Sequence, residues 1–303
     1  MDFRCLKPEE FEAWTQHCAG VFGESAEYFA RHFQNDPKAD LAGIFVAVDE
    51  GQIVSTVRVF TRAMYLKGRR VELGGIGEVS TKSEYRGRGL SARLLQMAVT
   101  YMEEKDMPVS MLFTGSNHHY ARQRWFTVNQ RFYRVSLTEA SDLEETMRLR
   151  PLEETDWPAV RGIHDLFSSG LDGVLVRDDP DYWAKWVRRE MGDAMVLEQD
   201  GRILAYLSAS AHREQTAVRE FGQLPECDVL LPMLAAVARE KSLPDAALIP
   251  VSLMQSNSLG YAERFSVMVR LNKPFALDGE WIDSDEKLAQ AMAQSTWWEV
   301  DGY

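Results

Sequence analysis

A glycine-rich turn lies between an apolar stretch and an amphipathic one, at residues 83–91, with the sequence Ser-Glu-Tyr-Arg-Gly-Arg-Gly-Leu-Ser. Glycine has no side chain to keep an anion away from the backbone N–H groups, and the first turn of a helix adds unpaired donors and a positive partial charge. Arg86 and Arg88 supply two more cations. The turn therefore predicts a pyrophosphate site, and a purely structural turn at a helix start is the equal alternative.

The spacing of these glycines argues against two common nucleotide motifs. It is not GxGxxG, and it lacks the lysine of a GxxxxGK[ST] loop, so neither a nicotinamide cofactor nor ATP is favoured. Residues 74–81, Gly-Gly-Ile-Gly-Glu-Val-Ser-Thr, together with the turn, resemble the cofactor motif of the GNAT N-acetyltransferase superfamily. In that family Gln or Arg is followed after two residues by Gly, and after one more by Gly or Ala. Arg86, Gly89 and Ser91 take these places, and Ser91 departs from the pattern by adding a hydroxyl.

The resemblance implies that acetyl-CoA is the acyl donor and that the segment from Val79 to Ala92 holds it. In the family, the strand backbone pairs with the pantetheine arm and the amides of the turn bind the pyrophosphate. Carried over to this sequence, the expected contacts are Val79, Ser80, Thr81, Arg86, Gly87, Arg88, Gly89, Leu90, Ser91 and Ala92, with the Asn117 side chain as a further hydrogen-bonding group.

Acyl transfer to an amine requires a base for the amine proton and an acid for the departing thiolate. Family members often carry a tyrosine on the helix that follows the next strand, and Tyr120 holds that place. A tyrosine, with an ordinary pKa of about 10, matches the basicity of a thiolate. Arg124 replaces the glycine of the family's Tyr-x-x-x-Gly-aromatic ending, so a packing role is the alternative for Tyr120.

Glu78 lies beside the expected pantetheine strand and is the candidate to accept the amine proton through water; Glu72 is less favourable. Both also fit as solvated strand residues. His118 and His119 are adjacent and have no third ligand at a suitable spacing, so no metal is predicted.

Four segments of the first half recur in the second half in the same order. The recurring pairs of segments are 3–10 with 149–154, the hairpin 44–54 with 194–204, the amphipathic stretch 94–108 with 230–244, and Ser116-Asn117 plus Tyr120-Ala121 with Ser256-Asn257 plus Tyr261-Ala262. The shift falls from 150 positions at the hairpin to 136 at the amphipathic stretch, so the second copy lacks residues where the first has its glycine-rich turn. This pattern predicts a duplicated domain that binds CoA only in its first copy.

The expected fold class is α/β, with a mixed α+β sheet flanked by helices in each of two tandem GNAT-like domains. The expected division is 1–142 for the acetyl-CoA-binding domain and 143–303 for a degenerate domain that shapes the acceptor cleft. In the first domain we expect a hairpin at 42–65, a strand at 71–81, a helix at 90–105 and a strand at 109–113. The layout is similar to tandem acetyltransferases, including the amino-terminal part of the enhanced-intracellular-survival type and mycothiol-synthase-like proteins.

The amino-acid composition limits the classes of partner that we expect for this protein. The chain of 303 residues has a net charge of −12, which disfavours nucleic acid and anionic membranes and favours a cationic acceptor. Its three cysteines form no CxxC pair, and no long apolar run predicts a membrane span, so we expect a cytoplasmic protein. The aromatic and acidic segment 297–303 predicts either a wall of the substrate cleft or an apolar plug on the second core.

The sequence thus predicts a transferase that moves an acetyl group from acetyl-CoA to an amine of a small molecule or peptide. The alternative is an acyl-CoA-binding regulatory or interaction protein without transferase activity.

Overall fold

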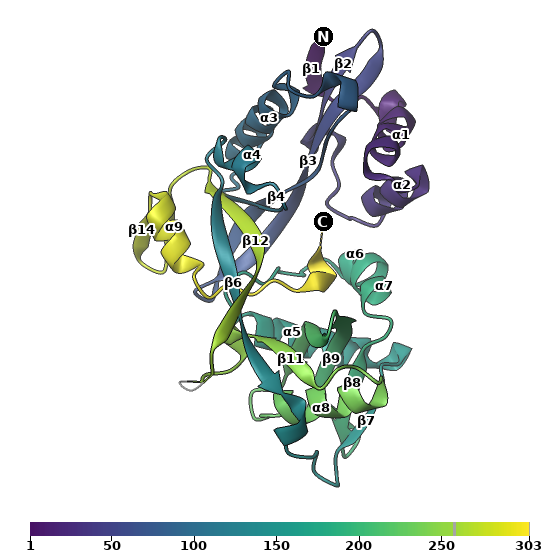
Figure 1. Ribbon diagram of the computed structural model, residues 1–303, viewed down its shortest axis with the longest axis vertical. Helices are drawn as coiled ribbons and strands as arrows, with labels where there is room; N and C mark the ends of the chain where they lie inside the picture. Colours follow the sequence, from purple (N-terminus) through teal and green to yellow (C-terminus); the bar gives the residue numbers. More distant parts are fainter. Residues whose placement is uncertain (257–258, 303) are drawn as a thin grey trace.

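A mixed sheet runs through the whole molecule in the computed structural model, which describes residues 1–256 and 259–302 (Figure 1). Among these residues the sheet has twelve strands in the order β1-β2-β3-β4-β5-β12-β6-β11-β10-β9-β8-β7. Helices pack on it, which confirms the expected mixed α/β class. No helix in this described part of the chain is both long and apolar enough to cross a membrane.

The first half of the sheet is covered on both faces. Its strands are β1 (Asp2–Cys5), β2 (Ile44–Asp49), β3 (Gln52–Leu66), β4 (Arg69–Thr81) and β5 (Val109–Phe113). Helices α1 (Phe11–Phe22) and α2 (Ala26–Gln34) lie on one face, and α3 (Leu90–Glu104) and α4 (Asn117–Ala121) on the other (Figure 1). Because both faces are covered, β3 reads as a nearly continuous buried run rather than an alternating one.

The expected elements of this half agree closely with the structure. The hairpin and the strand after it are β2, β3 and β4; the long helix ends one residue earlier than expected, and β5 has the predicted bounds. Helix α3 buries residues three or four apart, from Leu90 and Leu94 to Met102, as an amphipathic helix on a sheet must.

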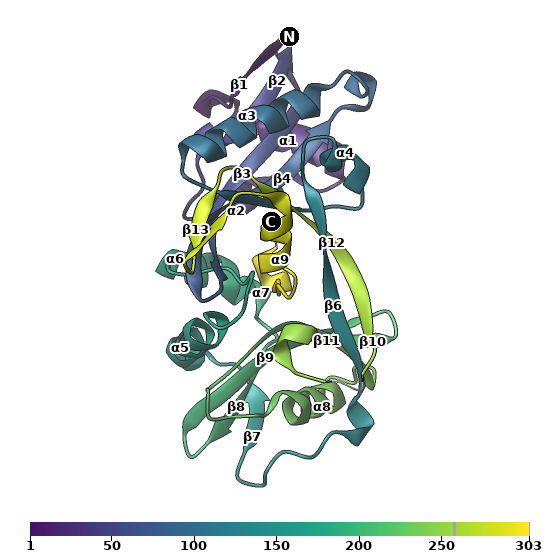
Figure 2. The same ribbon diagram turned by 90° about the vertical axis from the view of Figure 1, so that its left-hand side faces the viewer.

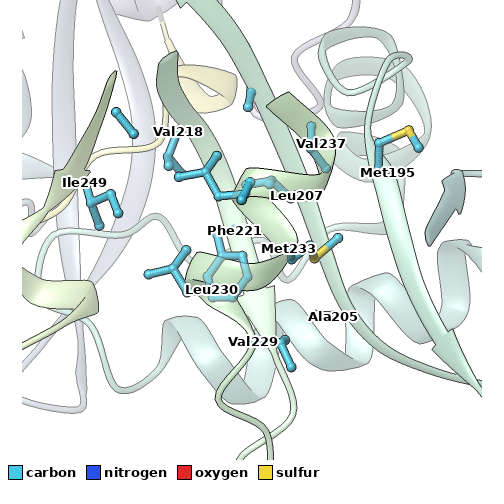
Figure 3. Close-up of a cluster of buried hydrophobic side chains, with 14 of the residues drawn as sticks. Met195, Ala205, Leu207, Val218, Phe221, Val229, Leu230, Met233, Val237 and Ile249 are labelled. Carbon is cyan, nitrogen blue, oxygen red and sulfur yellow. The ribbon is translucent and has the colours of Figure 1, made fainter. Parts of the chain in front are cut away.

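The second half has the same order of strands. They are β7 (Arg148–Pro151), β8 (Met195–Gln199), β9 (Arg202–His212), β10 (Gln215–Gln223) and β11 (Ala246–Pro250), with helices α5 (Trp157–Ser168), α6 (Pro180–Tyr182), α7 (Arg188–Glu190) and α8 (Leu230–Glu240). A short π-helix, Trp183–Val187, joins α6 to α7. Figure 3 shows the core of this half, where Phe221 of β10 packs with Leu230 and Met233 of α8.

The two halves exchange strands at the centre of the sheet. Strand β12 (Tyr261–Leu271) lies between β5 and β6 (Phe126–Ser136), antiparallel to both, and the later part of β6 pairs with β11. The strand order is therefore unchanged when β1 to β6 are swapped with β7 to β12. Since β12 belongs to the sheet of the first half, residues on both sides of position 142 build that sheet, and the division at 142 and 143 stays a prediction.

One side-chain pair repeats with the strands. Arg4 forms two hydrogen bonds of 2.7 Å to Glu10, and Arg150, 146 positions later, forms bonds of 2.6 and 2.9 Å to Asp156. The match between Tyr120 and Tyr261 was wrong, because Tyr261 begins strand β12 whereas Tyr120 lies on a helix. Asn257, from the same comparison, and Tyr303 lie outside the described residues.

The last described residues run between the two halves. After the hairpin of β13 (Phe275–Leu277) and β14 (Glu280–Ile282) and helix α9 (Asp285–Ala291), the chain reaches a position between the halves in both views (Figures 1 and 2). Trp298 and Val300 are buried in the two cores of the second half. The tail thus packs on the second core, as one of the two alternatives predicted, and its role as a wall of a substrate cleft stays a prediction.

Candidate functional site

A cavity of about 600 Å³ opens where β4 and β5 separate. The two strands are parallel and pair from Leu73–Val109 to Gly75–Met111, after which β4 continues to Thr81. The cavity is lined by Val21 and Phe22 from α1, by Val79 to Thr81, by the turn and the start of α3, and by Thr114, Ser116 and His118 to Tyr120. Since α1 and α4 lie on opposite faces of the sheet, the cavity extends between the strands from one face to the other.

Two glycines of the turn have a left-handed backbone conformation. Gly87 and Gly89 have φ values of 76° and 75°, in the left-handed region that favours glycine. A Cβ placed on either one would have no heavy atom within 4 Å, so each borders open space. Gly89 is also the N-cap of α3, and the first amides of that helix have no partner within the helix. The turn therefore has both the room and the donors that a pyrophosphate requires.

Eight of the eleven predicted cofactor contacts line this cavity: Val79, Ser80, Thr81, Arg86, Gly87, Gly89, Leu90 and Ser91. The other three lie outside its lining. Arg88 donates to the Glu84 carbonyl at 2.9 Å and covers the Tyr85 ring, while the Asn117 amide donates to Thr127 at 2.9 Å. Ala92 follows Ser91 in the first turn of α3. The roles of these three residues stay predictions.

Two histidines that the sequence analysis considered only as metal ligands line the cavity. His119 Nε2 lies 3.3 Å from Ser91 Oγ, and His118 lies beside it. Burial, with the charges of His118 and Arg122, lowers the pKa of His119. Ser91 has a hydroxyl where the family motif has Gly or Ala, and this departure was the sequence signal that a polar group, here His119, lies nearby. No group of three His, Cys, Asp or Glu among the described residues is arranged to hold a metal.

The predicted pantetheine strand is held from behind by two buried side chains. His17 Nε2 on α1 lies 3.0 Å from Ser80 Oγ, and Ser55 Oγ donates to the Ser80 carbonyl at 2.8 Å. Burial, with the charge of Lys82, lowers the pKa of His17 to about 4, so this imidazole is neutral at neutral pH. The segment from Val79 to Thr81 is thereby fixed before a ligand arrives.

Tyr120 lies on the α4 side of the cavity. It is 9% exposed and its ring packs edge-on against Trp125. Burial raises the pKa of Tyr120, so its phenol keeps its proton at neutral pH. In the described part of the chain no residue hydrogen-bonds the phenol. The geometry thus accommodates both the acid role and the packing role.

Glu78 lies at a bulge in β4 and belongs to a buried ionic cluster. Its φ of 52° is left-handed, and the pairing of β3 with β4 shifts register at this point. One carboxylate oxygen accepts from Arg58 at 3.3 Å and lies 3.5 Å from His32 Nδ1. Asp36 completes the cluster through Arg58 at 3.2 Å and Arg62 at 2.9 Å. Glu78 is therefore not a solvated strand residue, and it lies just outside the cavity lining.

This cluster was missed by sequence reasoning, although a signal exists. Arg58 and Arg62 interrupt the apolar run of β3, and a charge on a strand covered on both faces must find a partner. The Arg62 guanidinium lies near the rings of Tyr182 and Trp186, from the second half. Glu78 is therefore held by a cluster that joins the two halves.

The sequence of the first half and the fold of most of the chain resemble known proteins. Residues 2–127 match the family model for the acetyltransferase (GNAT) domain. An uncharacterized N-acetyltransferase from Archaeoglobus fulgidus is 31% identical over 84 residues, which is 28% of this chain and 56% of that protein. The aligned part thus spans little more than half of the relative's length.

Solved structures resemble most of the chain. A GCN5-related N-acetyltransferase from Anabaena variabilis superposes with a TM-score of 0.69 at 15% identity, covering 90% of this chain and 73% of that one. Eis1 from Mycobacterium abscessus gives a TM-score of 0.62 at 14% identity, covering 90% and 74%. At such identities these structures support the fold alone. The match to the acetyltransferase (GNAT) domain model is confined to residues 2–127 of the 303.

Proposed function

We propose that this protein is an acetyl-CoA-dependent N-acetyltransferase whose acceptor is an amine of a small molecule or peptide. The observation that carries the proposal is a single cavity that joins the free edge of β4, the two left-handed glycines and the start of α3. A strand edge suits the amides of a pantetheine arm, and a helix N-terminus beside glycines suits a pyrophosphate. When bound, acetyl-CoA supplies an activated acyl group as its thioester.

In the proposed reaction, Tyr120 is the acid. The amine nitrogen forms a bond to the thioester carbon, the carbon–sulfur bond breaks, and the phenol of Tyr120 gives its proton to the departing thiolate. A pKa raised by burial keeps the phenol protonated until the thiolate departs. The position of Tyr120 in the cavity lining supports this assignment.

Glu78 is the proposed base, acting through water. One of its carboxylate oxygens is buried and has no hydrogen-bond partner among the described residues, so it has the capacity to accept a proton or bind a water molecule. Arg58 donates to the other oxygen and thereby fixes the direction of the carboxylate, and His32 Nδ1 lies 3.5 Å from the same oxygen. The second half of the chain would cover the acceptor, and the acidic surface favours a cationic one.

The test measures CoA binding and thiol release separately. Calorimetry with CoA establishes binding, and a thiol-release assay with acetyl-CoA and a panel of amines establishes transfer. We expect both, with thiol release dependent on the amine. CoA binding without thiol release for any amine would instead favour the acyl-CoA-binding regulatory protein, and absence of CoA binding would reject both functions.

A further inference from the structure

A second cavity, of about 290 Å³, lies where the two halves meet. Its lining is Phe113, Gln130, Trp297, Trp298, Glu299 and Gly302, and we call it the junction cavity. Phe113 and Gln130 come from the central strands β5 and β6, and the other four residues come from the tail of the chain. Three of the six residues are aromatic and one is acidic.

The tail that forms one wall of the junction cavity is held rigidly. With its amide oriented so that both ends are satisfied, Gln130 accepts from the backbone N of Trp297 at 3.2 Å and from its indole Nε1 at 3.1 Å. Further along, Asp301 pairs with Arg177 at 2.9 Å, and Trp186 donates to the Val300 carbonyl at 3.0 Å. A wall fixed in this way is preorganised for a ligand, which lowers the entropic cost of binding.

Consecutive residues of the chain line the junction cavity and the proposed acetyl-CoA cavity. Phe113, the last residue of β5, lines the junction cavity, and the next residue, Thr114, lines the acetyl-CoA cavity. Side chains alternate along a strand, and Leu112 packs in the cluster under α3 whereas Met111 packs in the cluster on the opposite face. Phe113 therefore faces away from α3, on the side that a ligand passing between β4 and β5 would reach.

The chemistry of the junction cavity is that of a site for an organic cation with an apolar body. The faces of tryptophan and phenylalanine attract cations and bury apolar surface. Glu299 adds a negative charge at the exposed rim, where one of its carboxylate oxygens forms a long ion pair of 3.8 Å with Arg219. The buried indole Nε1 of Trp298 has no hydrogen-bond partner among the described residues and remains available as a donor.

We propose that the junction cavity binds the acceptor, and that the acceptor is a cationic amine carrying an aromatic or branched apolar body. The identification of this ligand as the acceptor rests on the proposed function. Trp297 is then a specificity-determining residue through its ring, and Glu299 through its charge. A short polar amine fills little of this space and gains little from the rings.

The test measures amine binding directly, by calorimetry at saturating CoA, with 2-phenylethylamine and ethanolamine as probes. The parent should bind 2-phenylethylamine about tenfold or more tightly than ethanolamine, because a ring buried in an apolar pocket gains at least this much. Trp297→Ala should abolish the preference. Glu299→Gln, at an exposed position, should weaken both amines without disturbing the core. Trp281→Ala and Glu145→Gln, both exposed and outside the cavity, are the matched controls and should behave as the parent does.

Each outcome separates the alternatives. Equal affinity for 2-phenylethylamine in the parent and Trp297→Ala would overturn the proposal. Hexanoyl-CoA is a further probe, for an acyl chain in the junction cavity. A Trp297→Ala variant that loses affinity only for hexanoyl-CoA would also overturn the proposal, because the cavity would then hold the acyl chain. If amines are acetylated with no dependence on Trp297 or Glu299, the junction site fails and the proposed function stands. If 2-phenylethylamine binds as expected but no thiol is released, the amine site stands and the proposed function fails.

Discussion

The imidazole Nε2 of His119 lies 3.3 Å from the hydroxyl oxygen of Ser91, and both residues line the proposed acetyl-CoA cavity at the start of α3. His118 and Arg122 of α4 are the neighbouring charges that lower the pKa of His119, after burial, and Arg86 of the turn lines the same cavity. His119 therefore favours its neutral form in the free protein. A pyrophosphate at the turn would favour the protonated form and raise this pKa.

CoA binding should therefore take up a proton at His119, and its affinity should rise as the pH falls and weaken as the pH rises through the pKa of His119 in the complex. His119→Phe removes this component and should cost about tenfold to 100-fold in affinity at low pH, because a charge-assisted hydrogen bond contributes about 1.5–3 kcal/mol. The measurement is CoA titration at several pH values. The phosphates of CoA also titrate, so the difference between parent and variant isolates His119, and His212→Phe on the distant end of β9 serves as the control. Parallel pH profiles for parent and His119→Phe would contradict the prediction.

Tyr120→Phe should lower the rate of thiol release by about 100-fold or more, the usual contribution of an acid positioned for proton transfer. Its affinity for CoA should stay at the parent value, because the ring that packs against Trp125 is retained. Tyr261→Phe, at a 56% exposed strand position, is the control and should keep full activity. A Tyr120→Phe enzyme that works at the parent rate would leave Tyr120 with a packing role.

Local sequence patterns were enough to predict the helices and strands of the first half, but not the strand pairing at the centre of the sheet. The periods of α3 and β3 and the turn residues between strands are properties of short segments, so their bounds followed from the sequence. The pairing of β12 with β5 and β6 could not be predicted in this way, because the sequence of an apolar strand does not indicate which neighbouring strand it pairs with. The same reason led to the wrong match of Tyr261 with Tyr120.

The candidate site was predictable to the extent that backbone conformation determines it. Gly87 and Gly89 permit the left-handed backbone that the turn adopts, so the shape of the turn was predictable, and its phosphate-binding role stays a prediction. The surroundings of Glu78 depend on Asp36, Arg58 and His32, which lie on other elements and meet only in the folded chain. The junction cavity needs the tail to return to β5 across more than half of the sequence, and no spacing rule anticipates that contact.

Gly89→Ala should weaken CoA binding by about tenfold or more, a loss of about 1.4 kcal/mol, because the new Cβ enters the space proposed for phosphate. The left-handed backbone itself penalises alanine by about 1–2 kcal/mol, so a control must share that penalty. Gly51→Ala does so, since Gly51 has a φ of 79° and open surroundings in the turn between β2 and β3. Both variants should lose similar thermal stability, but only Gly89→Ala should lose CoA affinity in calorimetry. Equal affinities would reject the turn as the phosphate site.

A second buried ionic cluster, centred on Arg177, joins the second half to the tail. Arg177 bonds both oxygens of Glu220, at 2.8 and 2.6 Å, and both oxygens of Asp301, at 2.9 Å each. Burial by itself would raise the pKa of Glu220, but Arg177 outweighs it and lowers that pKa. With a depressed pKa in the folded state, Glu220 contributes stability above the pKa of an unfolded glutamate, and this contribution is lost as the pH falls.

Arg177→Met should lower the free energy of unfolding by about 3–5 kcal/mol at neutral pH, because it leaves two buried carboxylates without their cation. Arg202→Met, which breaks an exposed pair with Glu226 at 2.8 Å, is the control and should cost under about 1 kcal/mol. Without Arg177, burial raises the pKa of Glu220, so protonation relieves the penalty and the gap between parent and variant should narrow as the pH falls. Urea unfolding of the three proteins at neutral and mildly acidic pH measures both effects. A gap that stays constant or widens towards acid would show that Glu220 does not depend on Arg177 for its charge.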